Sequence, residues 1–285
     1  MIFRVTEHKI FAGLCLMLIV ASLVSISPKL KDIVIKEKGT KLPIIVYHDI
    51  DNATQNLNEN SITSATLEQD LMYIKEKGYT TINMTQLIGH CLKGDDLPEK
   101  PIIICFDDGF KSTYTQAFPL LQKHNMCATV SVVGIYTDHS TEKENENFDS
   151  LYMNWDEIKN ISKSSFIEIQ NHSYDMHNQT GNRIGTRKKI NETEEEYCIA
   201  IKNDIDKLQS LLFDTIGFKP NTFVYTFNSN SKLSKKVLKE LGFNAALTNN
   251  KKVNVINSST DLFSLGRFHR TNDRTTEQFF ENILE

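Results

Sequence analysis

The chain has 285 residues, of which 40% are hydrophobic and 24% are charged, and its formal net charge is −4 at pH 7. This length and apolar content are enough to bury a complete single-domain core. The slightly acidic balance excludes the basic footprint of a nucleic-acid-binding protein, and five scattered cysteines without a C-x-x-C pair do not predict a disulfide framework.

The N-terminus carries an apolar segment preceded by positive charge. The run from Ile10 to Ile26 is at the short limit for a membrane span and is long for a signal-peptide core. We expect residues 1–27 to be an uncleaved signal-anchor at the cell membrane, with the remaining chain outside. A cleaved signal peptide, which would give a secreted protein, is the alternative. Residues 28–41 are charged and polar and predict a tether, which leaves residues 42–285 for the folded domain.

Strand and helix patterns alternate through this domain. Apolar runs bounded by turn residues predict strands at 42–50, 79–82, 101–106, 127–133, 166–170, 221–227, 244–248 and 262–268. Helical spacing and capping residues predict helices at 66–77, 85–91, 113–124, from 154, at 192–213, at 231–241 and from 275. The polar, acidic stretch 137–150 predicts a surface loop. The alternation predicts an α/β fold with a parallel sheet, most simply a barrel.

Titratable residues follow three of the predicted strands. Asp107 and Asp108 end the central strand, and because neighbouring side chains of an extended segment point opposite ways, one carboxylate could hold a metal while the other acts as a base. An Asp-Gly turn that caps the next helix is the alternative. His172 and His177 follow another strand, and their spacing requires a loop for the imidazoles to converge. One carboxylate and two imidazoles would leave open positions on zinc or a similar ion, as a hydrolase requires.

Three motifs in this chain resemble those of the polysaccharide deacetylases of the NodB-homology type. They are Cys105-Phe-Asp-Asp-Gly109, His172-Ser-Tyr-Asp-Met-His177 and Ile45-Val-Tyr-His-Asp49. The last of these is similar to the leading motif of the subgroup that includes the poly-N-acetylglucosamine deacetylases. The resemblance covers roughly residues 42–270 and implies a distorted (β/α) barrel.

Carried over by motif position, the resemblance implies a role for five residues. Asp107 would be the general base, and His48 the general acid, although a structural strand-end histidine is the alternative for His48. Asp108, His172 and His177 would bind a divalent metal, with Zn²⁺ expected first and Co²⁺, Ni²⁺ or Mn²⁺ as alternatives. The assignment is chemically consistent, because acid and base must be different groups on opposite sides of the reacting carbonyl.

Two assignments near the C-terminus are less direct. Arg267, at the end of the last predicted strand, could pair with Asp107 and orient it, or form an ordinary surface salt bridge. His269, two residues later, receives no role from the sequence.

The third family motif departs from its usual form. It appears here as Val224-Tyr-Thr-Phe-Asn228, in which Thr226 replaces a proline and Asn228 replaces a glycine. The backbone N–H of Phe227 would still be available as an oxyanion donor. Tyr225 and Phe227 could line a sugar subsite by stacking, and core packing is the alternative for both.

The resemblance therefore implies a metal-dependent hydrolase that removes acetyl groups from N-acetylglucosamine units of an extracellular glycan. Peptidoglycan of the cell wall and poly-N-acetylglucosamine are the expected substrates, and an O-acetyl xylan esterase is an alternative. The expected partners are the acetylated glycan and, through the N-terminal segment, the membrane, but no nucleic acid. A catalytically impaired glycan-binding domain is a further alternative, favoured by Thr226 and Asn228. A glycosidase would use two separated carboxylates but leave both histidines without a role.

Overall fold

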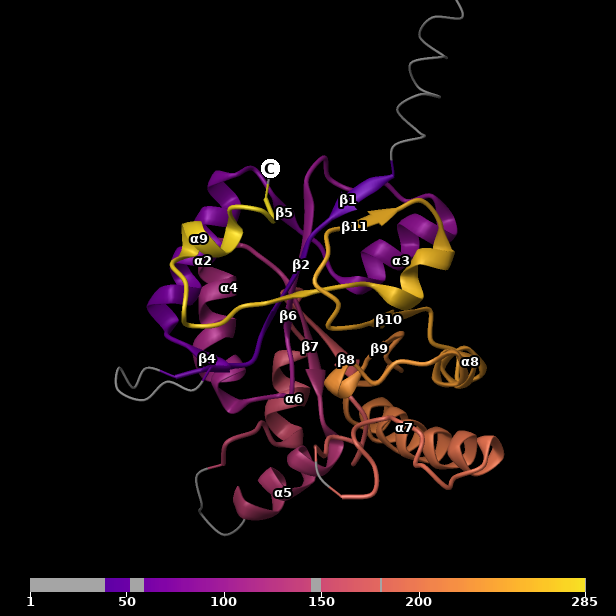
Figure 1. Ribbon diagram of the computed structural model, residues 1–285. Coiled ribbons are helices and arrows are strands. Elements are labelled where there is room, and N and C mark those ends of the chain that lie inside the picture. The colour runs from indigo at the N-terminus through magenta and orange to yellow at the C-terminus, as the bar shows by residue number, and fades with distance from the viewer. Residues whose placement is uncertain (1–38, 52–58, 145–149, 180, 285) are drawn as a thin grey trace, which may run out of the picture. The chain divides into compact units, whose positions relative to one another are not determined.

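The computed structural model in Figure 1 describes residues 39–51, 59–144, 150–179 and 181–284. By its contacts the chain divides into residues 1–40 and 41–285, and the fold given below is that of the second unit. The expected signal-anchor and most of the expected tether lie outside the described residues. Within the described ranges, no helix is both long enough and apolar enough to cross a membrane.

A parallel sheet forms the centre of the fold (Figure 1). Its strands lie in the order β10-β9-β8-β7-β6-β2-β12, and β5 pairs separately with β6. Their bounds are β2 (Ile44–Tyr47), β5 (Thr80–Thr81), β6 (Pro101–Phe106), β7 (Ala128–Val132), β8 (Ile167–Asn171), β9 (Thr222–Val224), β10 (Ala245–Leu247) and β12 (Phe268–His269). Every residue of β2, β6, β7 and β8 is buried. The continuous apolar runs of β2 and β6 therefore reflect a sheet that is covered on both faces, and β7 and β8 bury polar residues there as well.

The sheet curls into a distorted barrel because one short segment contacts both of its edges. Leu265 forms a parallel bridge with Leu247 in β10, and three residues later Phe268 pairs with Ile45 in β2. Alternate residues of β6 consequently belong to two different apolar clusters: Ile102, Ile104 and Phe106 to one, Ile103 and Cys105 to the other. The barrel architecture expected from the alternation of strands and helices is confirmed.

Helices and turns connect the strands and cover the sheet (Figure 1). The helices are α2 (Ser64–Glu76), α3 (Met84–Lys93), α4 (Phe118–His124), α5 (Gly134–Glu144), α6 (Trp155–Ile161), α7 (Glu194–Ile216), α8 (Lys232–Glu240) and α9 (Thr276–Phe280). A π-helical turn, Thr113–Ala117, precedes α4, and 3₁₀ turns occupy Thr226–Asn228 and Ser259–Ser264. Outside the main sheet lie β1 (Thr40–Leu42), β11 (Asn254–Ile256) and the pair β3 (Asp49–Ile50) and β4 (Ser61–Ile62).

Two helix predictions from the sequence were wrong in detail. The N-cap of α2 is Thr63 rather than Thr66, because the Thr63 hydroxyl accepts the backbone N–H of Thr66 at 3.1 Å. The stretch 137–150, expected to be a surface loop, begins within helix α5. This helix has polar residues on all sides and shows no apolar period, but Thr137 and Ser140 are buried against the fold. Tertiary contacts therefore stabilise a helix that the sequence pattern does not predict.

The last predicted strand, 262–268, was also wrong in extent. Residues up to Ser264 form a 3₁₀ turn, and the strand itself comprises Phe268–His269. Between them, the side chain of Asn254 accepts the N–H of Gly266 at 2.8 Å and donates to its carbonyl at 2.9 Å. The Asn254 side chain thereby satisfies the backbone groups of Gly266 that a strand partner would otherwise satisfy. Leu262 is buried although it belongs to the 3₁₀ turn and not to a strand.

Candidate metal centre and active site

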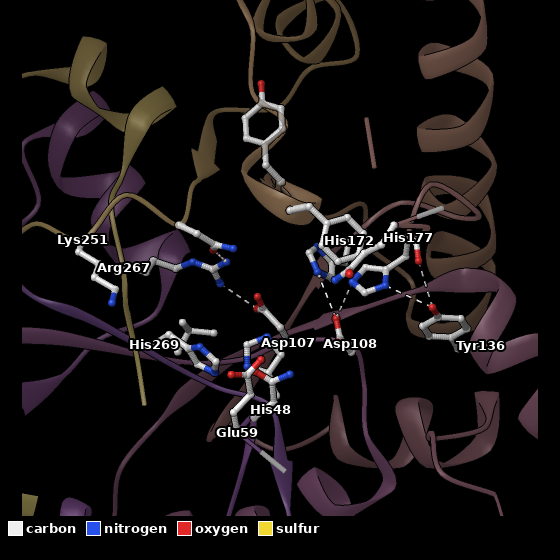
Figure 2. Close-up of a pocket in the computed structure, with 16 residues that line it drawn as sticks. His48, Glu59, Asp107, Asp108, Tyr136, His172, His177, Lys251, Arg267 and His269 are labelled. Carbon is white, nitrogen blue, oxygen red and sulfur yellow. Dashed lines mark hydrogen bonds and ion pairs between the residues drawn. The ribbon is translucent and has the colours of Figure 1, made fainter. Parts of the chain in front are cut away.

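The residues singled out by the sequence motifs meet in one pocket at the carboxyl ends of the strands (Figure 2). The register explains how they meet: Tyr47 pairs with Phe106, so that His48 and Asp107 follow side by side on neighbouring strands. The pocket has a volume of about 550 Å³. Among the residues lining it are His48, Glu59, Asp107, Asp108, Tyr136, His172, His177, Phe227, Lys251, Arg267 and His269.

Asp108, His172 and His177 present three ligand atoms within 4.8 Å of one another. Asp108 Oδ1 lies 3.0 Å from His177 Nε2 and 3.3 Å from His172 Nε2. Zinc bonds of about 2.0–2.1 Å at tetrahedral angles separate neighbouring ligand atoms by roughly 3.3–3.4 Å. Asp108 Oδ1 is buried yet has no well-aligned hydrogen bond, so the three atoms point toward a common centre rather than at one another. This donor set therefore fits a divalent cation.

The backbone after β6 turns Asp108 toward the two histidines. Asp108 has φ 69° and Gly109 has φ 74°, both in the left-handed region that aspartate tolerates and glycine favours. A Cβ atom at Gly109 would lie 3.1 Å from Val132 Cγ1, so glycine is also required for this close approach. Burial acts to raise the pKa of Asp108, but contact with the two histidines outweighs it and holds the pKa well below its ordinary value. The carboxylate is therefore ionised, as a metal ligand must be.

Each metal-facing histidine has a partner on its other ring nitrogen. His172 Nδ1 lies 2.8 Å from the carbonyl oxygen of Val224, which can only accept, so Nδ1 carries a proton and Nε2 is the nitrogen left to face a metal. His177 Nδ1 lies 3.2 Å from the Tyr136 hydroxyl, which donates in turn to the backbone oxygen of His177. Both imidazoles are thus oriented with Nε2 toward Asp108 (Figure 2).

Asp107 has a different environment from its neighbour. Its Oδ1 accepts hydrogen bonds from Ser131 Oγ and Arg267 Nη1, each at 2.8 Å. The side chain of Arg267 is fully buried, so this contact is a buried ion pair and not a surface salt bridge. Burial acts to raise the pKa of Asp107, but the guanidinium outweighs it and lowers the pKa to about 2. Asp107 is consequently an ionised carboxylate, not the cap of the following helix.

Arg267 is itself held in place by the loop after β10. Its Nε donates to the carbonyl of Thr248 at 3.2 Å, and its Nη2 donates to Asn249 Oδ1 at 2.6 Å. The guanidinium therefore has one orientation from which to contact Asp107.

His48 and His269 lie side by side in the same pocket (Figure 2). Their ring centroids are 4.6 Å apart, and His48 Nδ1 and His269 Nε2 are buried without a hydrogen-bond partner among the residues that the structure describes. Burial lowers the pKa of His48, although Asp108 and Asp107 oppose the shift, and burial together with His48 lowers the pKa of His269 to about 4. His269 was missed by sequence reasoning. The sequence feature that could have identified it is its position two residues after Arg267 in an extended segment, since this spacing places both side chains on one face.

The altered third motif keeps one of its two aromatic residues in the pocket. Phe227 lines the pocket with its ring centroid 4.7 Å from that of His177. Phe227 and Asn228 have φ 48° and 53°, and asparagine is the residue that best replaces glycine in this conformation. Thr226, in the place of the proline, donates to the carbonyl of Met176 at 3.0 Å and so ties this turn to the loop that carries His177.

Tyr225 does not stack in a sugar subsite, which corrects the sequence-based expectation. Although it borders the pocket, only 1% of the residue is exposed. Its ring packs edge-to-face on Phe223, and its hydroxyl lies 3.1 Å from Ser234 Oγ. Tyr225 is therefore a core residue, because the chain turns toward the pocket only after it.

Other pocket residues carried no signal in the sequence. Tyr136 lines the pocket from the first turn of α5, the helix that the sequence did not predict, and Ser131, which donates to Asp107, lies within β7. Glu59 and Lys251 are exposed charges at the pocket, from segments without a motif. Their proximity to the site arises only from tertiary structure.

Comparison with known proteins agrees with this geometry. Residues 94–246, more than half of the chain, match the family model described as polysaccharide deacetylase. The chain is 24% identical over 258 residues to a poly-beta-1,6-N-acetyl-D-glucosamine N-deacetylase of Escherichia coli (strain K12), covering 84% of this chain and 38% of that protein. It is 22% identical over 191 residues to a protein of the same name from Staphylococcus aureus (strain MRSA252), covering 67% and 62%. The chain thus spans less than two thirds of the length of both relatives.

Solved structures share the fold. The structure of IcaB from Ammonifex degensii aligns with a TM-score of 0.68 at 22% identity, covering 83% of this chain and 94% of that one. A de-N-acetylase from Aggregatibacter actinomycetemcomitans aligns with a TM-score of 0.71 at 20% identity, covering 86% and 100%. With the match to the family model, these findings show that the chain belongs to the polysaccharide deacetylase family.

Proposed function

We propose that this protein is a metal-dependent hydrolase that removes acetyl groups from N-acetylglucosamine units of an extracellular polysaccharide. The observation that carries the proposal is the convergence of Asp108, His172 and His177 beside an ionised Asp107 and a partly buried His48 in one pocket. Amide hydrolysis requires, in addition to substrate binding, a base and an acid on separate groups. Asp107 is the proposed base and His48 the proposed acid.

Asp108, His172 and His177 would hold the cation, which when bound supplies Lewis acidity toward the acetyl carbonyl and toward water. Asp107 accepts the proton of the attacking water. The hydrogen bonds from Ser131 and Arg267 both go to Oδ1, so Oδ2 is the oxygen that receives this proton. Because Arg267 keeps the carboxylate ionised, Asp107 is in its basic form across the neutral pH range.

His48 supplies the proton to the leaving amine. Its burial lowers the pKa of the imidazole, which makes the protonated ring a stronger acid toward the departing nitrogen. The negative charges of Asp108 and Asp107 oppose this shift without reversing it, so the pKa of His48 stays below its ordinary value. The backbone N–H of Phe227, at the pocket wall, is the proposed donor to the carbonyl oxygen as it becomes negative.

The proposed substrate is poly-N-acetylglucosamine or peptidoglycan. The names of the Escherichia coli and Staphylococcus aureus relatives support the first, and the family supports an acetylated glycan in general. We further propose that residues 1–27 anchor the enzyme in the cell membrane with the domain outside, as their charge and apolar run predict. Zn²⁺ is the proposed metal, since the ligand separations match a tetrahedral zinc site.

An acetate-release assay tests this function. Purified protein is incubated with poly-N-acetylglucosamine, peptidoglycan and O-acetylated xylan, with and without a chelator. We expect chelator-sensitive acetate release from an N-acetylated glycan. Release from xylan alone would establish an esterase instead, and glycan binding without release would establish an impaired, binding-only domain.

Substitution of the base is the sharpest variant for this assay. Asp107→Asn keeps the size of the side chain and an oxygen that can still accept from Ser131 and Arg267, but the amide cannot accept the proton of the water. We expect acetate release to fall by about 10²–10⁴-fold while the metal content stays at the wild-type level. A rate near that of the wild type would remove Asp107 from the mechanism.

A further inference from the structure

The segment from Asn171 to His177, here called the histidine loop, carries two of the three proposed metal ligands without being a helix or a strand beyond its first residue. Ser173, directly after His172, has φ 76°. A residue other than glycine persists in this conformation only where its surroundings impose it. The contacts that impose it therefore also determine how far apart His172 and His177 lie.

One set of contacts comes from a single carboxylate on helix α7. Asp204 Oδ1 accepts the backbone N–H of Tyr174 at 2.9 Å, and Asp204 Oδ2 accepts that of Asp175 at 2.8 Å. Both carboxylate oxygens are thus used on successive N–H groups between the two histidines. Hydrogen bonds to an ionised acceptor are stronger and shorter than those between neutral groups.

The start of the histidine loop is fastened to the same helix. Asn171 is fully buried, and its Nδ2 donates to the carbonyl of Ile205 at 3.2 Å and to Gln209 Oε1 at 3.1 Å. Its Oδ1 accepts the N–H of Ser173 at 2.8 Å, which supports the left-handed turn there.

Helix α5 holds the opposite side of the loop. The N–H of Gly134 donates to the carbonyl of Ser173 at 3.1 Å, and the N–H of Ile135 donates to that of Tyr174 at 2.8 Å. Every backbone polar group of Ser173 and Tyr174 therefore has a partner. Such full pairing is usual in a strand and fixes this loop in one conformation.

We propose that Asp204 is a positioning residue of the metal site, which sets the separation of His172 and His177 by holding the backbone N–H groups between them. It touches neither the ligands' imidazoles nor the pocket, and it acts only through the loop. The proposal rests on the proposed metal-binding role of the two histidines. Outer groups that orient metal ligands typically contribute 10–100-fold to metal affinity, and we expect an effect of about this size.

The test is the Zn²⁺ affinity of Asp204→Ala, measured on the full chain by competition with a chromophoric chelator. Asp206→Ala is the matched control, because Asp206 is an exposed aspartate two residues further along the same helix. We expect Asp204→Ala to weaken Zn²⁺ binding by about 10–100-fold and Asp206→Ala to leave it unchanged. Asp204→Asn keeps one oxygen acceptor, so we expect an intermediate loss, and this variant decides the matter if Asp204→Ala does not fold.

Thermal unfolding separates positioning from general stabilisation. Zn²⁺ that binds the folded state raises Tm according to its affinity, so a positioning role predicts a smaller Zn²⁺-induced rise in Asp204→Ala. Equal losses of Tm with Zn²⁺ and with chelator, at unchanged Zn²⁺ affinity, would overturn the proposal and leave Asp204 a purely structural residue. If the wild-type chain binds no Zn²⁺, the metal assignment itself falls, and this inference falls with it.

Discussion

Asp107 and Asp108 are chemically identical neighbours whose environments separate their roles. Asp107 Oδ1 contacts Arg267 and Ser131, whereas Asp108 Oδ1 lies between the Nε2 atoms of two histidines. The left-handed turn at Asp108 makes this separation possible, because it redirects the second carboxylate out of the strand direction. One carboxylate is thereby matched to a fixed cationic side chain and the other to the proposed metal.

His172→Ala tests the metal half of this division. Removing one of three protein ligands should abolish tight metal binding and acetate release together, because two ligands cannot hold the ion in a defined geometry. Metal content by elemental analysis of the purified variant is the measurement. Wild-type metal content in His172→Ala would exclude His172 from the ligand set.

Arg267→Met tests the other half. The Arg267 side chain is fully buried and is paired with Asp107, so its loss leaves a buried carboxylate without a counter-charge. We expect a decrease of about 3–5 kcal/mol in the free energy of unfolding, measured by urea titration. Arg267→Lys keeps the charge but not the planar fork, so we expect a smaller loss of stability together with reduced acetate release. Unchanged stability of Arg267→Met would show that Asp107 is not dependent on this pair.

At the scale of elements, helix α5 matters more than its sequence suggests. Its first turn binds the histidine loop through the N–H groups of Gly134 and Ile135, and Tyr136 contacts His177. Nothing in the polar stretch that follows shows a helical apolar stripe. The helix forms because its first turn and Asp138, which accepts hydrogen bonds from Trp155 Nε1 and the Tyr174 hydroxyl, have partners elsewhere in the fold. Its function and its stability therefore come from the same contacts.

Gly134→Ala tests this coupling. An added Cβ atom would lie 2.5 Å from Tyr174 Cδ2 and 3.2 Å from Tyr174 Cα, so the histidine loop must move. We expect a loss of about 1–3 kcal/mol in the free energy of unfolding from overpacking and a measurable decrease in Zn²⁺ affinity. The two quantities are measured by urea titration and by chelator competition. Wild-type Zn²⁺ affinity in this variant would show that the loop can shift without disturbing the ligands.

At the scale of the whole molecule, the C-terminal segment closes the barrel and is fastened at a second buried ion pair. Asp70 in α2 is fully buried and accepts hydrogen bonds from Arg270 Nε at 2.8 Å, Thr276 Oγ1 at 2.6 Å and the Tyr47 hydroxyl at 3.1 Å. These contacts join a helix from the first third of the domain, a central strand and the final helix. The segment that carries Arg267 and His269 into the pocket is therefore held from the far side by Arg270.

Arg270→Met should release this closure. It leaves the buried Asp70 carboxylate without its cation, and we expect a loss of about 3–5 kcal/mol in the free energy of unfolding. Arg274→Met is the matched control, because the Arg274 side chain is 57% exposed and its Nε lies 4.0 Å from Asp273 Oδ2, which is itself exposed. We expect this control to change stability by less than about 0.5 kcal/mol in the same urea titration. Similar effects of the two substitutions would contradict a closing role for Arg270.

The sequence by itself determined the strands that are buried on both faces, the amphipathic helix α7 and the residues that follow the strand ends. These features are encoded locally: an apolar run predicts β6, a periodic stripe predicts α7, and the motif residues Asp107, Asp108 and His172 stand where predicted strands stop. Their proximity in one pocket followed from the parallel order of the strands. Their chemical roles stay predictions until the variants are measured.

Only the tertiary structure decided which groups surround these residues. That Arg267 forms a buried pair with Asp107, that Tyr225 faces the core, that His269 adjoins His48 and that Asp204 holds the histidine loop all depend on segments far apart in the chain. No local pattern records such contacts, because hydrogen bonds and ion pairs between distant segments leave no period in the sequence. The sequence therefore indicates the candidate reacting groups, whereas the folded barrel alone determines their partners and orientation.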